Sequence, residues 1–177
     1  MLNLQKEVLI MELLDVYNEN FEKTGKIVPR RTILPENEFV LCTHILIQDM
    51  EGRFLVQKRS DTKSTRPGQW DITAGAVDSG EDSRTAAIRE AKEEVGLDVP
   101  EKDMQFLFRD RIGGAYHEAW YVRMPFTLED CTMQESEVQD LRLVTAEELL
   151  VILEQFPHRS EDYKQEMRNF LHQFCAD

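Results

Sequence analysis

Residues 75–81, GAVDSGE, and residues 89–97, REAKEEVGL, are the most informative part of this chain of 177 residues. Between them lie Asp82 and Ser83, and either side chain can cap the start of a helix. Residues 86–95 contain no helix breaker, and Gly96 is placed to end the helix in a left-handed conformation. The sequence therefore predicts a glycine-containing loop that leads into a helix ending before Gly96.

The predicted helix carries acidic side chains along one edge. Glu90, Glu93 and Glu94 share that edge, while Ala91 and Val95 lie on the adjacent apolar face. Side chains three or four positions apart are ~5–6 Å from each other. At that distance two like charges repel by roughly 0.8 kcal/mol in water and roughly 3 kcal/mol at an effective dielectric constant of 20. A bound divalent cation would reverse the sign of this interaction.

The ligand chemistry of this edge favours a hard cation. Carboxylate oxygens without His or thiolate neighbours suit Mg²⁺, with Mn²⁺ as a substitute, better than they suit zinc. Gly75 lies where a strand ends, so its own carbonyl could approach the metal. Arg89 lies one turn before Glu93 and could pair with it or reach back to Glu81, which would hold the carboxylates in place.

The rest of the chain predicts an α/β protein. We expect an N-terminal hairpin arm over residues 1–37, with strands at 12–17 and 26–28, followed by one domain over residues 38–177. In that domain we expect strands at residues 38–48, 53–58, 70–74, 97–99, 104–111 and 116–124. A capping box predicts a helix over 145–153, and apolar residues repeat at helical spacing near the C-terminus: Tyr163, Met167, Phe170, Leu171 and Phe174. Helices on both faces of a mixed sheet make an α/β/α sandwich.

Composition excludes several classes of protein. The 21 Lys and Arg residues against 34 Asp and Glu give a formal charge of −13, which disfavours binding to a nucleic-acid duplex. The longest apolar stretch, residues 40–47, is too short to cross a bilayer, and residues 1–10 do not resemble a secretory signal. The cysteines, Cys42, Cys131 and Cys175, are odd in number and form no Cys-x-x-Cys pair, so we expect reduced thiols and a cytoplasmic protein. The arm is compatible with a monomer or a homodimer.

Residues 75–97 resemble the Nudix box, the loop-helix-loop motif of the Nudix hydrolase superfamily. The matching positions are Gly75, Glu81, Arg89, Glu90, Glu93, Glu94, Gly96 and Leu97. One position departs from the motif, because Ala91 is smaller than the usual aliphatic residue, and this alters packing but not metal ligation. The resemblance implies a Nudix-type α/β/α sandwich. It also implies a metal-dependent hydrolase of a small-molecule diphosphate, in which water attacks phosphorus.

The resemblance also implies residue roles. Glu90 and Glu94 would be direct metal ligands, Glu93 a ligand or its support, and Gly75 a carbonyl ligand. The general base stays open, because in this family it comes either from the box, here Glu90, or from a later segment. The later candidates are Glu118, Glu135 and Glu137, and Glu118 is also a candidate substrate contact.

Four cations upstream of the box are candidate phosphate contacts. Lys58, Arg59, Lys63 and Arg66 stand close together in an otherwise acidic chain, and each could instead pair with a surface carboxylate. Their segment is similar to the branch of the superfamily that includes isopentenyl-diphosphate isomerase. That enzyme uses a cysteine shortly after the Trp of this segment, whereas residues 71–76 here contain none. An isomerase is therefore the second hypothesis, and a binding module without turnover is the third.

Overall fold

Strand β3 (Val40–Gln48) is the central strand of the fold, and it carries apolar side chains on both faces. Ile45 and Ile47 contact one hydrophobic cluster, while Leu46 between them contacts another. This alternation is what a strand covered on both faces requires. The computed structural model describes residues 12–156 and 159–175.

A mixed sheet of seven strands is built around β3. The strand β8 (Ala115–Arg123) runs parallel to β3 over its full length, and β7 (Gln105–Ile112) adds to β8 in the antiparallel direction. At the other edge of β3, β6 (Thr73–Ala76) pairs with its first half, and the hairpin to β4 (Phe54–Arg59) begins at its end. β4 in turn pairs with β5 (Trp70–Asp71) and β9 (Val138–Val144).

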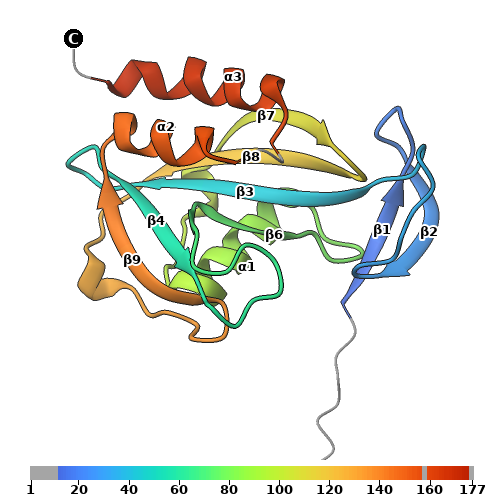
Figure 1. The fold of residues 1–177 in the computed structure, drawn as a ribbon, viewed down its shortest axis with the longest axis horizontal. Helices are drawn as coiled ribbons and strands as arrows, with labels where there is room; N and C mark the ends of the chain where they lie inside the picture. The colour runs from blue at the N-terminus through green and yellow to red at the C-terminus, as the bar shows by residue number, and fades with distance from the viewer. Residues whose placement is uncertain (1–11, 157–158, 176–177) are drawn as a thin grey trace, which may run out of the picture.

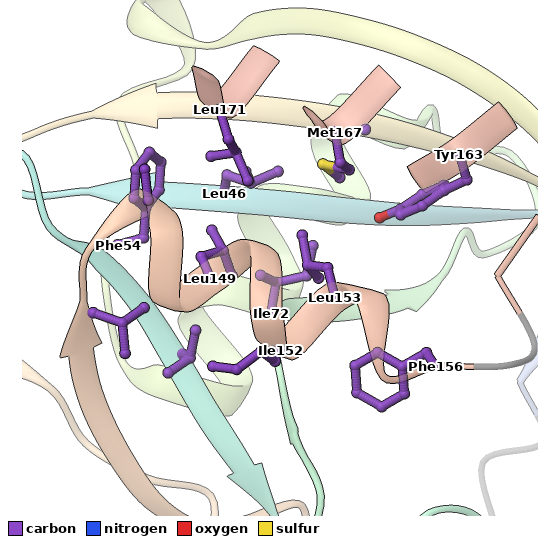
Figure 2. Close-up of a cluster of buried hydrophobic side chains, with 14 residues drawn as sticks. Leu46, Phe54, Ile72, Leu149, Ile152, Leu153, Phe156, Tyr163, Met167 and Leu171 are labelled. Atoms are coloured by element: carbon purple, nitrogen blue, oxygen red, sulfur yellow. The ribbon is translucent and has the colours of Figure 1, made fainter. Parts of the chain in front are cut away.

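Helices cover both faces of this sheet (Figure 1). Helix α1 (Ser83–Val95) packs on one face through Ala87, Ala91 and Val95. Helices α2 (Ala146–Glu154) and α3 (Glu161–Leu171) cover the other face. Figure 2 shows side chains of these two helices, among them Leu149 and Leu171, in one buried cluster with the sheet residues Leu46 and Phe54. The predicted α/β/α sandwich is confirmed.

The predicted helix caps are also present. The Asp82 carboxylate accepts a hydrogen bond of 2.8 Å from the Thr85 amide, and Gly96 ends α1 in the left-handed region with φ 78°. Thr145 and Glu148 form the expected capping box at the start of α2. Of the apolar residues predicted on one face of the last helix, Tyr163, Met167 and Leu171 are fully buried.

The hairpin arm folds back onto its own domain. Strands β1 (Leu13–Tyr17) and β2 (Lys23–Pro29) pair with each other, and Tyr17 forms a bridge to Phe39 just before β3. Asp15 accepts hydrogen bonds from the Ser79 hydroxyl and the Gly80 amide, which belong to the loop that enters α1. The arm therefore lies beside the box. The remainder of the predicted arm, residues 1–11, falls outside the described residues, as do 157–158 and 176–177.

One strand prediction was wrong, one strand was not predicted, and one prediction was imprecise. Residues 97–99 are not a strand: Leu97 and Val99 are apolar because they are buried against α1. Strand β9 was missed because it is an edge strand whose outward residues are polar, so its sequence VQDLRLV resembles a loop. The strand predicted at 70–74 is divided into β5 and β6.

Short 3-10 turns connect several elements: Glu101–Asp103, Leu128–Asp130 and His172–Phe174. All three cysteines are free thiols. Over the described part of the chain, we find no helix with the length and apolar character needed to cross a bilayer.

Candidate active site

A cavity of about 430 Å³ opens beside α1. We call it the carboxylate cavity. Five separate parts of the chain line it: α1, β6 with the loop that follows it, the end of β4 with the loop that follows it, the loop before β9, and the N-terminal arm. Its charged lining residues are Glu12, Arg30, Arg31, Arg59, Lys63, Asp78, Arg89, Glu90, Glu93, Glu94 and Glu137.

Glu94 is the most buried acid of the cavity, with 4% of the residue exposed. Burial raises the pKa of its carboxyl from 4.5 to about 8, and the nearby Glu90 adds to the increase. One hydrogen bond lowers the pKa in part: the Gln57 side-chain amide donates to Glu94 Oε2 at 2.7 Å, which stabilises the ionised carboxylate. The Thr73 hydroxyl donates to the other end of the Gln57 amide at 3.2 Å and so fixes its orientation. Glu94 is therefore held by a chain of neighbours on β4 and β6.

Glu90 lies against Gly75 of β6. A Cβ atom placed on Gly75 would come within 2.0 Å of Glu90 Oε1, so the Glu90 carboxylate occupies space that only a glycine leaves open. Burial raises the pKa of Glu90 from 4.5 to about 7, although Arg89 lowers it in part. The close approach explains the glycine at this position of the box.

Arg89 organises the acids of the box. It donates two hydrogen bonds to Glu81, of 3.1 and 3.0 Å, a bond of 2.8 Å to Glu90 and a longer one of 3.4 Å to Glu93. Its Nη2 also donates to the Ala76 carbonyl at 3.0 Å. These partners raise the pKa of Arg89 despite its partial burial. The predicted contacts with Glu81 and Glu93 are both present.

The donor set fits a hard divalent cation. Glu90 and Glu94 are oxygen donors that repel each other, and burial further raises the pKa of both groups. Glu93 is half exposed at the rim of the same cavity. Within residues 12–156 and 159–175, no group of three His, Cys, Asp or Glu side chains has the arrangement needed to hold a metal ion. Arg89 now provides the positive charge beside these acids.

Glu137 enters the cavity from the loop before β9. That loop is fixed to the end of α1, because the Gln134 amide donates to the Glu94 carbonyl at 3.1 Å and the Thr132 amide to the Val95 carbonyl at 3.0 Å. The Glu137 carboxylate forms an ion pair with Lys63. Two of the predicted residues, far apart in the sequence, thus meet at the cavity.

Other candidates lie elsewhere. Glu118 is not a lining residue of the carboxylate cavity: it is buried on β8, where it accepts hydrogen bonds from Ser83 and, at 2.8 Å, from Arg109 Nε. Arg66 forms an ion pair of 3.0 Å with the buried Asp71. Glu135 is exposed and is also absent from the lining.

The two cations at the end of β4 have different environments. Arg59 lines the cavity, whereas Lys58 does not. Successive side chains of a strand point to opposite faces, and Gln57 contacts Glu94, so the adjacent Lys58 faces away from the carboxylates. Of the four predicted phosphate contacts, the structure therefore places Arg59 and Lys63 at the cavity.

Sequence reasoning missed Gln57, Arg30 and Arg31. Gln57 carried a signal, because it is a polar residue in the apolar run of β4 and is almost fully buried. The two arginines carried none, since nothing in their spacing shows that the arm folds back beside the box.

The comparisons with known proteins agree with this geometry. The family model described as NUDIX domain matches residues 39–173. An uncharacterised Nudix hydrolase of Listeria innocua, lin0387, is 37% identical over 140 residues, which cover 78% of this chain and 83% of the relative. The uncharacterised Nudix hydrolase YfcD of Escherichia coli K12 is 33% identical, over 86% of this chain and 84% of its own.

Solved structures give the same fold. The crystal structure of DR0079 from Deinococcus radiodurans superposes with a TM-score of 0.70, covering 89% of this chain and 98% of that one at 22% identity. The family model covers far more than half of the chain, and the Listeria and E. coli relatives match over most of their length. The chain therefore belongs to the Nudix hydrolase family.

Proposed function

We propose that this Nudix hydrolase uses Mg²⁺ to cleave a diphosphate linkage in a nucleoside diphosphate derivative or a similar small molecule, with water attacking phosphorus. The observation that carries the proposal is a pair of carboxylates, the buried Glu94 and the partly buried Glu90, which repel each other in a cavity also lined by cations. When bound, the metal supplies positive charge that activates water and stabilises the charge developing on the phosphate oxygens.

The following residues of the cavity then have roles in binding the metal and the substrate. Glu90 and Glu94 would hold the metal with Glu93 and the Gly75 carbonyl beside them, and Mn²⁺ could replace Mg²⁺. Arg89 positions these carboxylates through its contacts with Glu81 and Glu90. Arg59 and Lys63 would bind the phosphate oxygens of the substrate.

Glu137 is the general base that the geometry favours among the later candidates. It lines the cavity, whereas Glu118 and Glu135 do not. Lys63 now pairs with Glu137, and a substrate phosphate would compete for that lysine and free the carboxylate to take a proton from water. Glu90 stays the alternative base within the box, with a pKa of about 7.

The isomerase hypothesis is supported less well. A cysteine close to the metal carboxylates is needed for it, and none of the three cysteines lines the carboxylate cavity. Burial raises the pKa of Cys42 to about 11, so its thiol stays protonated at neutral pH. A binding module without turnover is also disfavoured, because all the box carboxylates are in place. The free thiols support our proposal that the enzyme acts in the cytoplasm.

The test is a screen of nucleoside diphosphate derivatives with Mg²⁺ in ¹⁸O-labelled water, followed by mass spectrometry of the products. Label in a phosphate product is the expected result. Conversion of isopentenyl diphosphate to its allylic isomer would support the second hypothesis instead. Binding of a substrate without any product would support the third.

The variant Glu94→Gln keeps the shape of the side chain and removes its charge. We expect turnover to fall by two or more orders of magnitude, because the metal loses its most buried ligand, while the circular dichroism spectrum stays unchanged. Glu135→Gln, at the exposed acid nearby, is the matched control and should keep full activity. Metal-dependent turnover by Glu94→Gln close to the wild-type rate would contradict the proposed site.

A further inference from the structure

The N-terminal arm forms one wall of the carboxylate cavity. Glu12, Arg30 and Arg31 line it, although they lie more than 40 residues before the box in the sequence. Arg30 is held in place by an ion pair with Glu12 and by its amide, which donates to the Glu12 carbonyl at 2.9 Å. Its charge reaches the box, where it lowers the pKa of Glu90. The arm therefore brings two arginines to the cavity that the acids of α1 line.

Arg31 differs from the other arginines of the cavity. Arg30 pairs with Glu12, Arg89 pairs with Glu81, and Arg59 donates to the Thr65 carbonyl. Among the described residues, Arg31 has neither an ion pair nor a hydrogen bond of its side chain, in a chain with an excess of 13 negative charges. Because Arg31 is exposed and lines the cavity, its guanidinium is available to a ligand there.

The backbone of Arg31 supplies a second, independent observation. Its φ angle is 72°, in the left-handed region that residues with a Cβ atom rarely adopt. Such conformations persist where the surroundings impose them, and they are concentrated at binding sites. Glycine would fit this position better for stability alone. The chain instead has an arginine there, at the edge of the carboxylate cavity.

We propose that Arg31 binds a phosphate group of the substrate in the carboxylate cavity, so that the hairpin arm is part of the active site. This inference rests on the proposed function. A guanidinium presents several N–H groups in one plane and matches two phosphate oxygens at once. The carboxylates of α1 would hold the metal, and Arg31 would bind phosphate oxygens of the same diphosphate.

Calorimetry with methylenediphosphonate and Mg²⁺ tests the inference without any turnover. We expect Arg31→Ala to weaken binding by tenfold or more, which corresponds to ~1.4 kcal/mol. Arg31→Lys should restore part of the affinity, because it returns the charge but not the planar fork. Arg123→Ala is the matched control: Arg123 is exposed, its side chain donates only to the Met50 carbonyl, and it does not line the cavity. Unchanged affinity in Arg31→Ala would overturn the inference.

A second variant separates binding from folding. Arg31→Gly should raise the midpoint of thermal unfolding, since glycine adopts the left-handed conformation freely, and it should still weaken methylenediphosphonate binding. On a substrate found in the screen, both variants should raise KM and change kcat by less than about threefold. If the wild-type protein binds the diphosphonate but cleaves no substrate, the proposed hydrolysis fails while Arg31 stays a phosphate ligand. If Arg31→Gly binds as tightly as the wild type, Arg31 is not a ligand.

Discussion

At the carboxylate cavity, the Glu90 carboxylate occupies the space that a side chain at position 75 would need. We therefore expect Gly75→Ala to displace the Glu90 carboxylate, because the added Cβ would lie 2.0 Å from its Oε1. The backbone at Gly75 is not left-handed, and the displaced atoms are the end of a flexible side chain, so the fold should survive. Misplacement of a catalytic group by about 1 Å can cost ~100-fold in rate. Steady-state kinetics should show a loss of that order in kcat/KM, with little change in thermal stability.

Gly114→Ala is the matched control for this variant. Gly114 also has a backbone outside the left-handed region, and an added Cβ there would meet no atom within 4 Å. It lies in the turn between β7 and β8 and does not line the cavity. Wild-type kcat/KM in both variants would mean that the position of Glu90 beside Gly75 does not matter for the reaction.

Among the structural elements, the arm is joined to the loop before α1 by the Leu13 carbonyl, which accepts from the Ser79 amide at 2.7 Å, and by the Asp15 carboxylate. Asp15 of β1 accepts hydrogen bonds from Ser79 Oγ at 2.8 Å and from the Gly80 amide at 3.0 Å, and it pairs with Lys23 at 2.6 Å. Burial alone would raise the pKa of Asp15, but these bonds outweigh it and lower the pKa. The ionised carboxylate is therefore the form that joins the arm to the loop before α1.

We expect Asp15→Ala to loosen the arm without unfolding the sandwich. Bonds to a charged group contribute about 1.5–3 kcal/mol, and Asp15 is only partly exposed. Hydrogen exchange should become faster at the amides of β1 and β2, while the amides of β3 and α1 keep their protection. Glu38→Ala, which removes an exposed ion pair with Lys26, is the control. Equal protection of β1 in Asp15→Ala and the wild type would show that the arm is attached in another way.

The elements also show where sequence reasoning succeeds. Helix α1 was predictable because Asp82 and Gly96 mark its ends chemically, and its apolar face repeats at the helical period. Strand β9 was not, because the alternation Val138, Asp140, Arg142, Val144 mixes apolar and charged residues on one face. Strand β9 forms because it pairs with β4, and its own sequence does not have to show a strand pattern.

At the scale of the whole molecule, the candidate site shows the same contrast between what the sequence predicts and what only the fold reveals. Three acids of the cavity, Glu90, Glu93 and Glu94, come from one helix, so their spacing along α1 was sufficient to place them together. Apart from Arg89 of α1, the cations come from the arm, the end of β4 and the loop after it, and only the tertiary fold brings Arg31, Arg59 and Lys63 to one cavity. For the same reason sequence reasoning grouped Arg66 with the site, although its partner is the buried Asp71.

The balance of charges across the molecule predicts how stability depends on pH. Burial raises the pKa of Glu90 to about 7 and of Glu94 to about 8, whereas in the unfolded chain both return to about 4.5. Between pH 4.5 and 8 the native state therefore binds more protons than the unfolded state, so the free energy of unfolding decreases as the pH rises. Glu94→Gln cannot ionise at that position and should lose part of this slope. Because both proteins share every histidine, the difference between their slopes isolates the carboxylate.

Mg²⁺ should oppose this loss of stability, because it binds the ionised carboxylates of the native state and competes with their protons. Protein treated with EDTA should show a lower thermal midpoint at pH 8 than at pH 5.5. Addition of Mg²⁺ should raise the midpoint at pH 8 by several degrees, have little effect at pH 5.5, and have little effect on Glu94→Gln at either pH. The measurement needs no substrate, so it tests the metal site independently of turnover. If the wild type and Glu94→Gln have parallel pH profiles of stability and neither responds to Mg²⁺, these carboxylates do not form the metal site.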